Sequence, residues 1–123
     1  MNKNQALYKF WSSFNIPAYE VNSVPDDATL PYITYTDQIG YMGDNNYLTA
    51  SVWDFSNTNS WGYVIDKADE IGRYLGDGGK TLRYDDGLMW VRRGTPFGQR
   101  MNEPSDERIK RMLINVQIEF ISN

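Results

Sequence analysis

Residues 75–84, LGDGGKTLRY, are the part of this chain that most resembles a nucleotide-binding loop. A Walker loop has a glycine five residues before its Gly-Lys-Ser/Thr, so that successive N–H groups wrap around the phosphates. The residue five before Gly79 is Tyr74, which is not glycine. The stretch also follows a predicted amphipathic helix, which places Gly76 at the helix C-terminus, where carbonyl groups and not N–H groups are free. We therefore interpret these glycines as a helix cap and not as a phosphate site.

Two other groups of polar residues suggest chemistry, but turns and caps explain them better. The adjacent carboxylates Asp26-Asp27 and Asp85-Asp86 lie in turn sequences, where consecutive side chains point apart, whereas an acid–base pair must converge on a substrate. Residues 57–68, NTNSWGYVIDKA, have the first, third and sixth residues of a calcium loop. Tryptophan at the fifth position and alanine at the last remove oxygens that the ion needs. Helix capping is the better interpretation of this segment.

The chain contains neither cysteine nor histidine. This excludes disulfides, thiolate metal sites and catalytic triads that depend on Cys or His. Any catalysis would have to use carboxylates, lysine, tyrosine or an acquired metal. We therefore expect a protein that is not an enzyme and that needs no cofactor or metal.

Length and charge point to one domain with no strong affinity for nucleic acid. The 123 residues are enough for a single core. The net charge is −4 and uneven: residues 1–82 hold 5 Lys/Arg and 10 Asp/Glu, and residues 83–123 hold 7 and 6. A protein that reads duplex DNA normally presents a strong basic face. No apolar run approaches the ~18 residues of a membrane helix, and the N-terminus lacks the features of a signal peptide, so we expect a soluble protein.

The hydrophobic pattern predicts an α+β domain with the order α-β-β-β-α-β-β-β. Helical spacing of Leu7, Phe10, Trp11 and Phe14 predicts a first helix over 3–14, and a longer apolar stripe predicts a second over 61–75. Aromatic and β-branched runs predict the strands, at 18–22, 32–37, 47–55, on both sides of an Asp86-Gly87 turn within 80–93, and at 108–121. We expect a mostly antiparallel sheet of about six strands with both helices packed on one face.

The final strand has a further consequence. If 108–121 is unbroken, it spans about 45 Å at about 3.3 Å per residue, so we expect it to overhang the domain or to bend at a bulge. Strand addition between neighbouring sheets through this terminal strand is one possible mode of assembly.

Two exposed regions are candidates for a subunit or partner interface. The polar stretch 94–106, GTPFGQRMNEPSD, predicts a protruding loop or arm, because loops of this length are more often functional or disordered than idle. Around it, residues 92–111 hold six Lys/Arg and three Asp/Glu. The alternative is a solvated hairpin end. A second region is the glycine-bearing loop QIGYMGDNN. The candidate interface residues are Tyr41, Met42, Arg92, Arg93, Phe97, Arg100 and Met101, with the arginines expected to pair with acids on a neighbouring chain.

Three segments carry a resemblance to a known family: LPYITYTD, YLTASVWDFSNTNSWGYVIDKADEIGRYL and the closing INVQIEF. The pattern resembles the tail-terminator proteins of long-tailed bacteriophages, which are also called tail-completion, head–tail joining or minor capsid proteins. The resemblance implies a homo-oligomeric ring, usually a hexamer, that caps the tail tube, ends its polymerisation and joins it to the head connector or stopper protein. DNA would pass through the lumen without sequence-specific contact, with no membrane involved.

The resemblance also implies a location in the virion, at the interface of tail and head, and in the host cytoplasm during assembly. It carries over no single functional residue, because the function of such a ring lies in its geometry. The alternatives are another phage neck or tail-tube structural protein, or a small non-viral module that binds a protein or peptide through its aromatic surface. A third hypothesis is a carboxylate-dependent enzyme or a nucleotide-binding protein.

Overall fold

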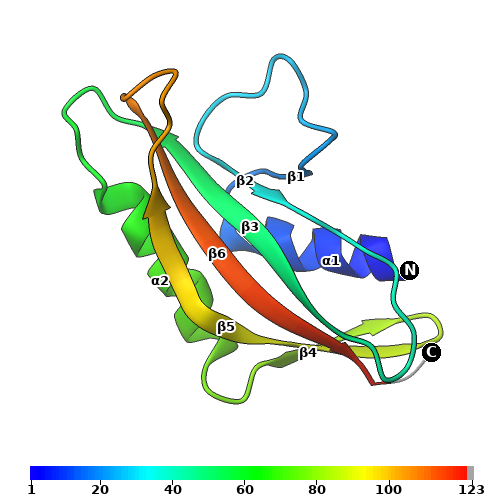
Figure 1. Ribbon diagram of the computed structural model, residues 1–123. Helices are drawn as coiled ribbons and strands as arrows, with labels where there is room; N and C mark the ends of the chain where they lie inside the picture. Colours follow the sequence, from blue (N-terminus) through cyan, green and yellow to red (C-terminus); the bar gives the residue numbers. More distant parts are fainter. Residues whose placement is uncertain (122–123) are drawn as a thin grey trace.

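The computed structural model describes residues 1–121, so the last two residues of the predicted 1–123 domain lie outside the described residues. Two helices and six strands follow one another in the predicted order (Figure 1). The elements are α1 (Lys3–Trp11), a short 3-10 helix η1 (Ser12–Phe14), β1 (Ala18–Glu20), β2 (Tyr32–Tyr35), β3 (Asn45–Phe55), α2 (Gly62–Leu75), β4 (Lys80–Tyr84), β5 (Gly87–Met101) and β6 (Ile109–Phe120).

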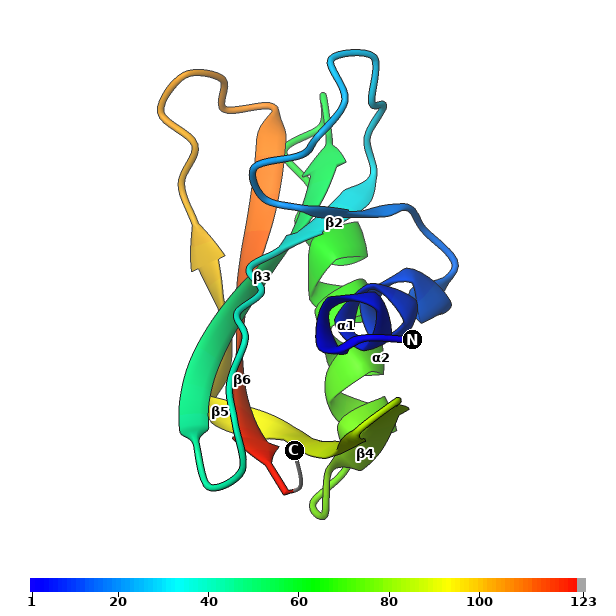
Figure 2. The same cartoon turned by 90° about the vertical axis from the view of Figure 1, so that its right-hand side faces the viewer.

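The strands form one mixed sheet in the order β1-β2-β3-β6-β5-β4. The β1–β2 pair is parallel and the other pairs are antiparallel. This confirms a mostly antiparallel sheet, although the parallel pair was not predicted. Figures 1 and 2 show a strongly curved sheet with both helices on the same side. The core lies between this side of the sheet and the helices.

The N-terminal helix α1 begins with a capping box. The Asn2 side chain accepts a hydrogen bond from the Gln5 N–H, and the Gln5 side chain accepts one from the Asn2 N–H. The helix ends at Trp11 and not at residue 14, because the next three residues tighten into η1 and Asn15 turns left-handed, with φ 67°. Phe14 nevertheless stays buried beside Phe10.

The second helix, α2, begins at Gly62, with Trp61 as its N-cap. It ends at Leu75, and the C-cap is Gly76, whose φ of 63° is a backbone conformation that favours glycine. The Gly76 N–H donates to the Gly72 carbonyl at 3.0 Å. The predicted helix cap at Gly76 is therefore confirmed. The other two glycines of the Walker-like stretch, Gly78 and Gly79, lie in the turn between α2 and β4.

The C-terminal strand β6 lies in the middle of the sheet, between β3 and β5. Its register with β3 is unbroken from Asn45–Glu119 to Phe55–Ile109. Because both of its edges are paired, β6 cannot add to a neighbouring sheet. The prediction that the terminal strand mediates strand addition is therefore wrong.

The predicted loop at 94–106 is mostly strand. β5 continues to Met101, and Gly98 to Met101 pair with β6 beyond a register shift between Arg93 and Gly98. The shift breaks the alternation of side chains, so the sequence pattern there no longer looks like a strand. Only residues 102–108 connect β5 to β6 as a loop.

Candidate interface surfaces

The predicted interface residues are spread along the length of β6 and do not gather at one place. Tyr41 and Met42 are exposed in the connection between β2 and β3, next to the C-terminal end of β6. At the opposite end of the same strand, Met101 pairs with Arg111. The eight residue steps from Arg111 to Glu119 span about 26 Å at about 3.3 Å per residue. Arg100 and Met101 are therefore far from Tyr41 and Met42. Arg92, in contrast, pairs with Gln117 on one side of β6 while Tyr47 pairs with it on the other, so Arg92 lies near the end of β6 that the β2–β3 connection contacts.

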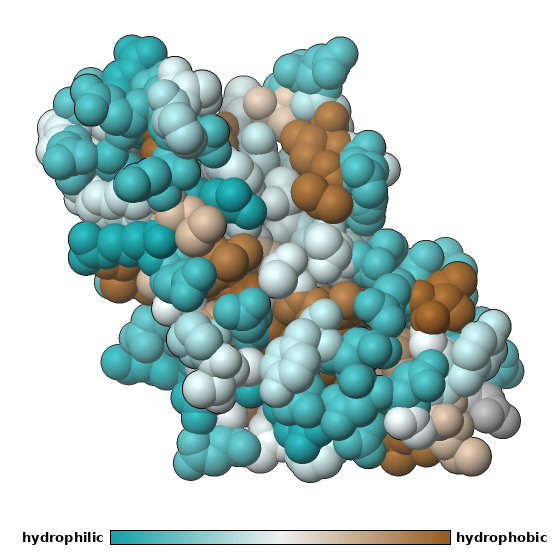
Figure 3. Space-filling view, viewed as in Figure 1, coloured by the Kyte–Doolittle hydropathy of each residue, from teal (hydrophilic) through white to brown (hydrophobic). Residues whose placement is uncertain are grey.

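Four exposed hydrophobic side chains surround the β2–β3 connection, and we call them the terminal patch. They are Ile39, Tyr41, Met42 and Tyr47, each between 63% and 66% exposed. Figure 3 shows apolar surface at this lower right corner of the molecule. The Gly43 N–H donates to the Phe120 carbonyl at 2.9 Å, and the Lys3 ammonium lies 4.4 Å from the Tyr41 ring centre. These contacts hold the connection against the sheet, so the patch is presented on an ordered backbone.

Sequence reasoning named Tyr41 and Met42 but missed Ile39 and Tyr47. Ile39 lies inside the glycine-bearing segment QIGYMGDNN and Tyr47 directly follows it, so their place in the sequence was the available signal. Tyr47 lies in β3 and looked like the start of an ordinary alternating strand. Its exposure follows from its position on the side of β3 that the helices leave uncovered.

The two predicted arginines Arg92 and Arg93 have partners within the chain. The Arg92 guanidinium lies 3.9 Å from the Trp90 ring centre, and its Nη2 lies 3.4 Å from Glu119 Oε1. Arg93 forms an ion pair with Asp77, in the turn after α2. Both guanidinium groups therefore have an acidic partner within the chain, and their pairing with acids on a neighbouring chain stays a prediction.

Phe97 is half-buried and packs against the hydrophobic core. A Cβ placed on Gly72 of α2 would lie 2.9 Å from Phe97 Cε2. The ring thus fills the space that this helical glycine leaves open. Phe97 therefore belongs to the packing between α2 and the sheet, and its contact with another subunit stays a prediction.

The other end of the β5–β6 hairpin is also held by internal contacts. The exposed Arg100 guanidinium lies 5.3 Å from the Trp61 ring centre, and Met101 is half-buried. Lys110 is buried and its Nζ donates to Asn59 Oδ1 at 2.7 Å. Within the 102–108 loop, the hydrogen bond from Arg108 holds the pKa of Asp106 below its usual value.

The outer face of the sheet, away from the helices, is covered by half-exposed side chains. Trp53 Nε1 donates to Thr34 Oγ1 at 2.8 Å, and the Arg111 guanidinium lies 4.8 Å from the Trp53 ring centre. Arg111 also donates from Nε to Ser51 Oγ at 3.0 Å. This network fixes the indole and orders the face without a second layer of helices.

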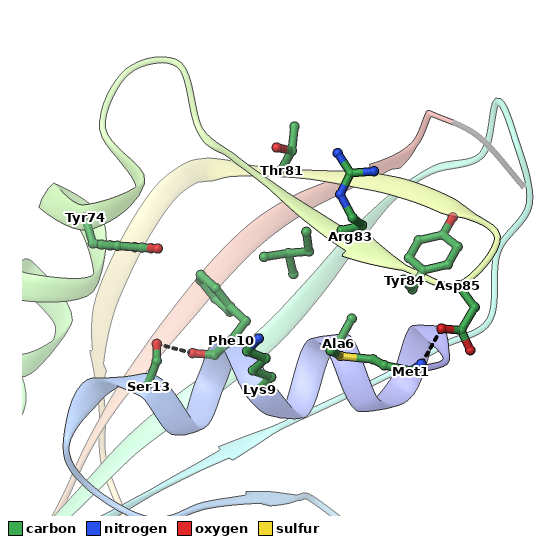
Figure 4. Close-up of a pocket in the computed structure, with 11 residues that line it drawn as sticks. Met1, Ala6, Lys9, Phe10, Ser13, Tyr74, Thr81, Arg83, Tyr84 and Asp85 are labelled. Carbon is green, nitrogen blue, oxygen red and sulfur yellow. Dashed lines mark hydrogen bonds and ion pairs between the residues drawn. The ribbon is translucent and has the colours of Figure 1, made fainter.

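A groove between α1 and β4 was not predicted from the sequence. It has a volume of about 670 Å³, and its walls come from α1, the end of α2 and β4 (Figure 4). Its lining residues include Lys9, Phe10, Tyr74, Leu82 and Arg83. At one end, the Asp85 N–H donates to the Met1 carbonyl at 2.8 Å, which joins the two walls. Because the walls come from three separate segments, no local pattern in the sequence reveals the groove.

Burial raises the pKa values of two tyrosines, Tyr35 in the core and Tyr84 in the wall of the groove. The pKa of Tyr35 on β2 is raised to about 12, chiefly because the phenol is desolvated and secondly because Asp37 is nearby. Burial also raises the pKa of Tyr84. Both phenols therefore remain protonated in neutral solution.

No protein-family model matches this chain, and no curated protein sequence matches it. Within residues 1–121, no group of three or more Asp or Glu side chains is placed to hold a metal ion. Neither helix in this part of the chain is long and apolar enough to cross a membrane.

Proposed function

We propose that this chain is a structural subunit of a phage tail terminator: a ring, usually hexameric, that caps the tail tube, ends its polymerisation and joins it to the head connector. The observation that supports a docking function is the terminal patch, with its four exposed hydrophobic side chains on an ordered connection. The specific assignment to phage tails rests on the family resemblance of the sequence. DNA passes through the lumen of this ring without sequence-specific contact.

The composition of the terminal patch is that of a protein interface. Tyrosine and methionine are enriched at such interfaces, and contiguous exposed apolar side chains mark docking sites. The patch residues contribute little to the core because they are mostly exposed. Substituting them should therefore impair docking while leaving the fold intact. We assign the patch to contact with the tail tube or the head connector.

The test is a binding assay with purified tail tubes that have an open end. Tyr41→Ser combined with Met42→Ser should weaken binding to the tubes about tenfold or more, which is the effect expected of an interface hot spot. Tyr63→Ser is the matched control, because Tyr63 is exposed on α2, away from the patch. Equal binding by the patch variant and the control would contradict the assignment. Binding of neither the wild type nor the variants to tubes or connectors would contradict the proposed function.

A second candidate is a small module that binds a peptide or protein, and the groove between α1 and β4 favours it. An open groove with aromatic walls beside an edge strand is suited to an extended segment. This candidate predicts a stable monomer or dimer that does not cap tail tubes. Tube-length distributions in the presence of the protein distinguish the two, because only a terminator limits the growth of the tube.

A further inference from the structure

The charges of this chain divide across its sheet. Residues 10–66 contain seven Asp or Glu and no Lys or Arg. Asp66 lies on α2, and the other six acids lie in or between β1, β2 and β3, which occupy one half of the sheet, whereas β6, β5 and β4 occupy the other half. Ten of the twelve Lys and Arg residues lie between residues 67 and 111. One side of the molecule is therefore acidic and the other side carries most of the cations.

The carboxylates of the acidic side have no ion-pair partners within the described part of the chain. This holds for all seven acids in residues 10–66. Asp26 and Asp27 are exposed on the loop at 21–31, between β1 and β2, and Figures 1 and 2 show this loop projecting from the body. The loop also carries the half-buried apolar residues Val24 and Leu30, and Figure 3 shows apolar surface in this region. It thus combines carboxylates with apolar side chains and contains no cation.

The groove between α1 and β4 has the complementary chemistry. Lys9, Lys80 and Arg83 are exposed at its walls or rim, and none of the three has an ion-pair partner within residues 1–121. Its apolar walls are Phe10 and Leu82. The acidic exceptions at this edge are Asp85 and Asp86 in the β4–β5 turn, and Asp85 is paired with the N-terminal ammonium. Figure 4 shows Lys9 and Phe10 on the α1 side of the groove.

The edge strand β4 also offers backbone hydrogen-bonding groups. Tyr84 pairs with Gly87 across a two-residue turn, and such a pair bonds through its backbone, as does every second pair along the ladder. Thr81 and Arg83 are the alternate residues, so their N–H and C=O groups point away from β5. No described residue is bonded to these outward groups. An open edge of this kind accepts a further extended segment.

We propose that the groove between α1 and β4 receives the loop at 21–31 of a second copy of this chain. Asp26 and Asp27 of the loop meet the cations of the groove, and its apolar residues meet the walls formed by Phe10 and Leu82. The loop and the groove are different surfaces, so the contact is heterologous: each copy offers its loop to one neighbour and its groove to another. Heterologous contacts close into a ring when the rotation between copies permits.

This inference rests on the proposed self-assembly and specifies which surfaces meet. It leaves the terminal patch free for the tail tube or connector. Charge attraction between exposed groups weakens as salt screens it, with a Debye length of ~8 Å at physiological ionic strength and ~30 Å at ~0.01 M. Association of the chain should therefore be strongest in low salt and should decline as salt is added.

Charge reversal on either surface tests the proposal by sedimentation in low salt. Asp26→Lys with Asp27→Lys, and separately Lys80→Glu with Arg83→Glu, should each weaken association about tenfold or more, because like charges then face each other. An equimolar mixture of the two variants should recover association, and so should a chain that carries all four substitutions. Asp66→Lys is the control, because Asp66 is exposed on α2 and lies outside both surfaces. Circular dichroism checks that each variant is folded.

A second pair of variants tests the edge strand. Thr81→Pro removes the outward N–H without removing a bond to β5, since proline is tolerated on strand edges. It should weaken association, while Thr81→Val should not. Equal association by the two variants would overturn the role of the edge. A wild-type chain that stays monomeric in low salt, or charge variants that assemble normally or fail to rescue each other, would overturn the loop-in-groove contact. If such variants still form rings that cap tubes, only this contact is wrong and the proposed function stands.

Discussion

The contact between Gly72 on α2 and Phe97 on β5 gives a prediction that can be worked through as a double-mutant cycle. Burying a phenylalanine fully is worth about 3–5 kcal/mol against alanine. Because Phe97 is half-buried, Phe97→Ala should lower the free energy of unfolding by about 2 kcal/mol. If Phe97 were instead a free arm residue, this substitution would change the stability by less than about 0.5 kcal/mol.

The second substitution, Gly72→Ala, should change the free energy of unfolding differently in the wild type and in Phe97→Ala. Alanine in place of a helical glycine stabilises a helix by about 1 kcal/mol. In the wild type, however, the new Cβ would lie 2.9 Å from the Phe97 ring, well inside the ordinary carbon contact of about 3.5–4.0 Å. Overpacking of this kind costs about 1–3 kcal/mol. Gly72→Ala should therefore be neutral to destabilising in the wild type and stabilising by about 1 kcal/mol beside Phe97→Ala.

The assay is urea unfolding of the four proteins, followed by tryptophan fluorescence. Dilute protein in high salt suppresses the proposed self-association, which would otherwise add to the apparent stability. The expected interaction energy between the two substitutions is about 1–3 kcal/mol. Additive effects, or an unchanged stability of Phe97→Ala, would refute the packing of Phe97 on α2.

Three further predictions follow from individual residues. The folded-state pKa of Tyr35 is raised to about 12 from its usual 10.0, so the unfolded chain loses this proton first. The stabilisation that comes from the protonated Tyr35 phenol should be complete below pH 10. The free energy of unfolding should then fall by about 1.4 kcal/mol per pH unit as the pH rises towards 12. In thermal melts at alkaline pH, Tyr35→Phe should show a shallower decline. Gly94→Ala should destabilise the fold by about 1–3 kcal/mol in urea titrations, since the new Cβ would lie 2.8 Å from the backbone oxygen of Asn115. The carboxyl of Asp106 should titrate below 3.8 by NMR and return towards that value in Arg108→Gln, because the hydrogen bond from Arg108 lowers its pKa; an unchanged titration curve would rule out this bond in solution.

The sequence predicted the elements whose information is local. The stripe of α2 and the glycine that ends it are spaced by the helix itself, so their pattern could be read directly. The strands could be found by their alternation, but the parallel pairing of β1 with β2 could not, because alternation does not encode which strands are neighbours. The second half of β5 was missed because its register shift breaks the alternation.

The candidate interface also contains features that are encoded locally and features that depend on residues far away in the sequence. The exposure of Tyr41 and Met42 could be predicted because a glycine-bearing loop leaves its side chains in solvent. The partners of Arg92 and Phe97 could not, because Glu119 and Gly72 lie far away along the chain. The groove was invisible for the same reason, since its walls are contributed by α1, α2 and β4.

The most direct test of a ring-forming terminator is the native mass of the purified chain in low salt, measured over a concentration series with negative-stain images of any large species. We predict one closed assembly of about six copies with a central hole, formed by a heterologous contact that repeats around the ring. A monomer or dimer at every concentration, with no rings on the ends of added tail tubes, would contradict it.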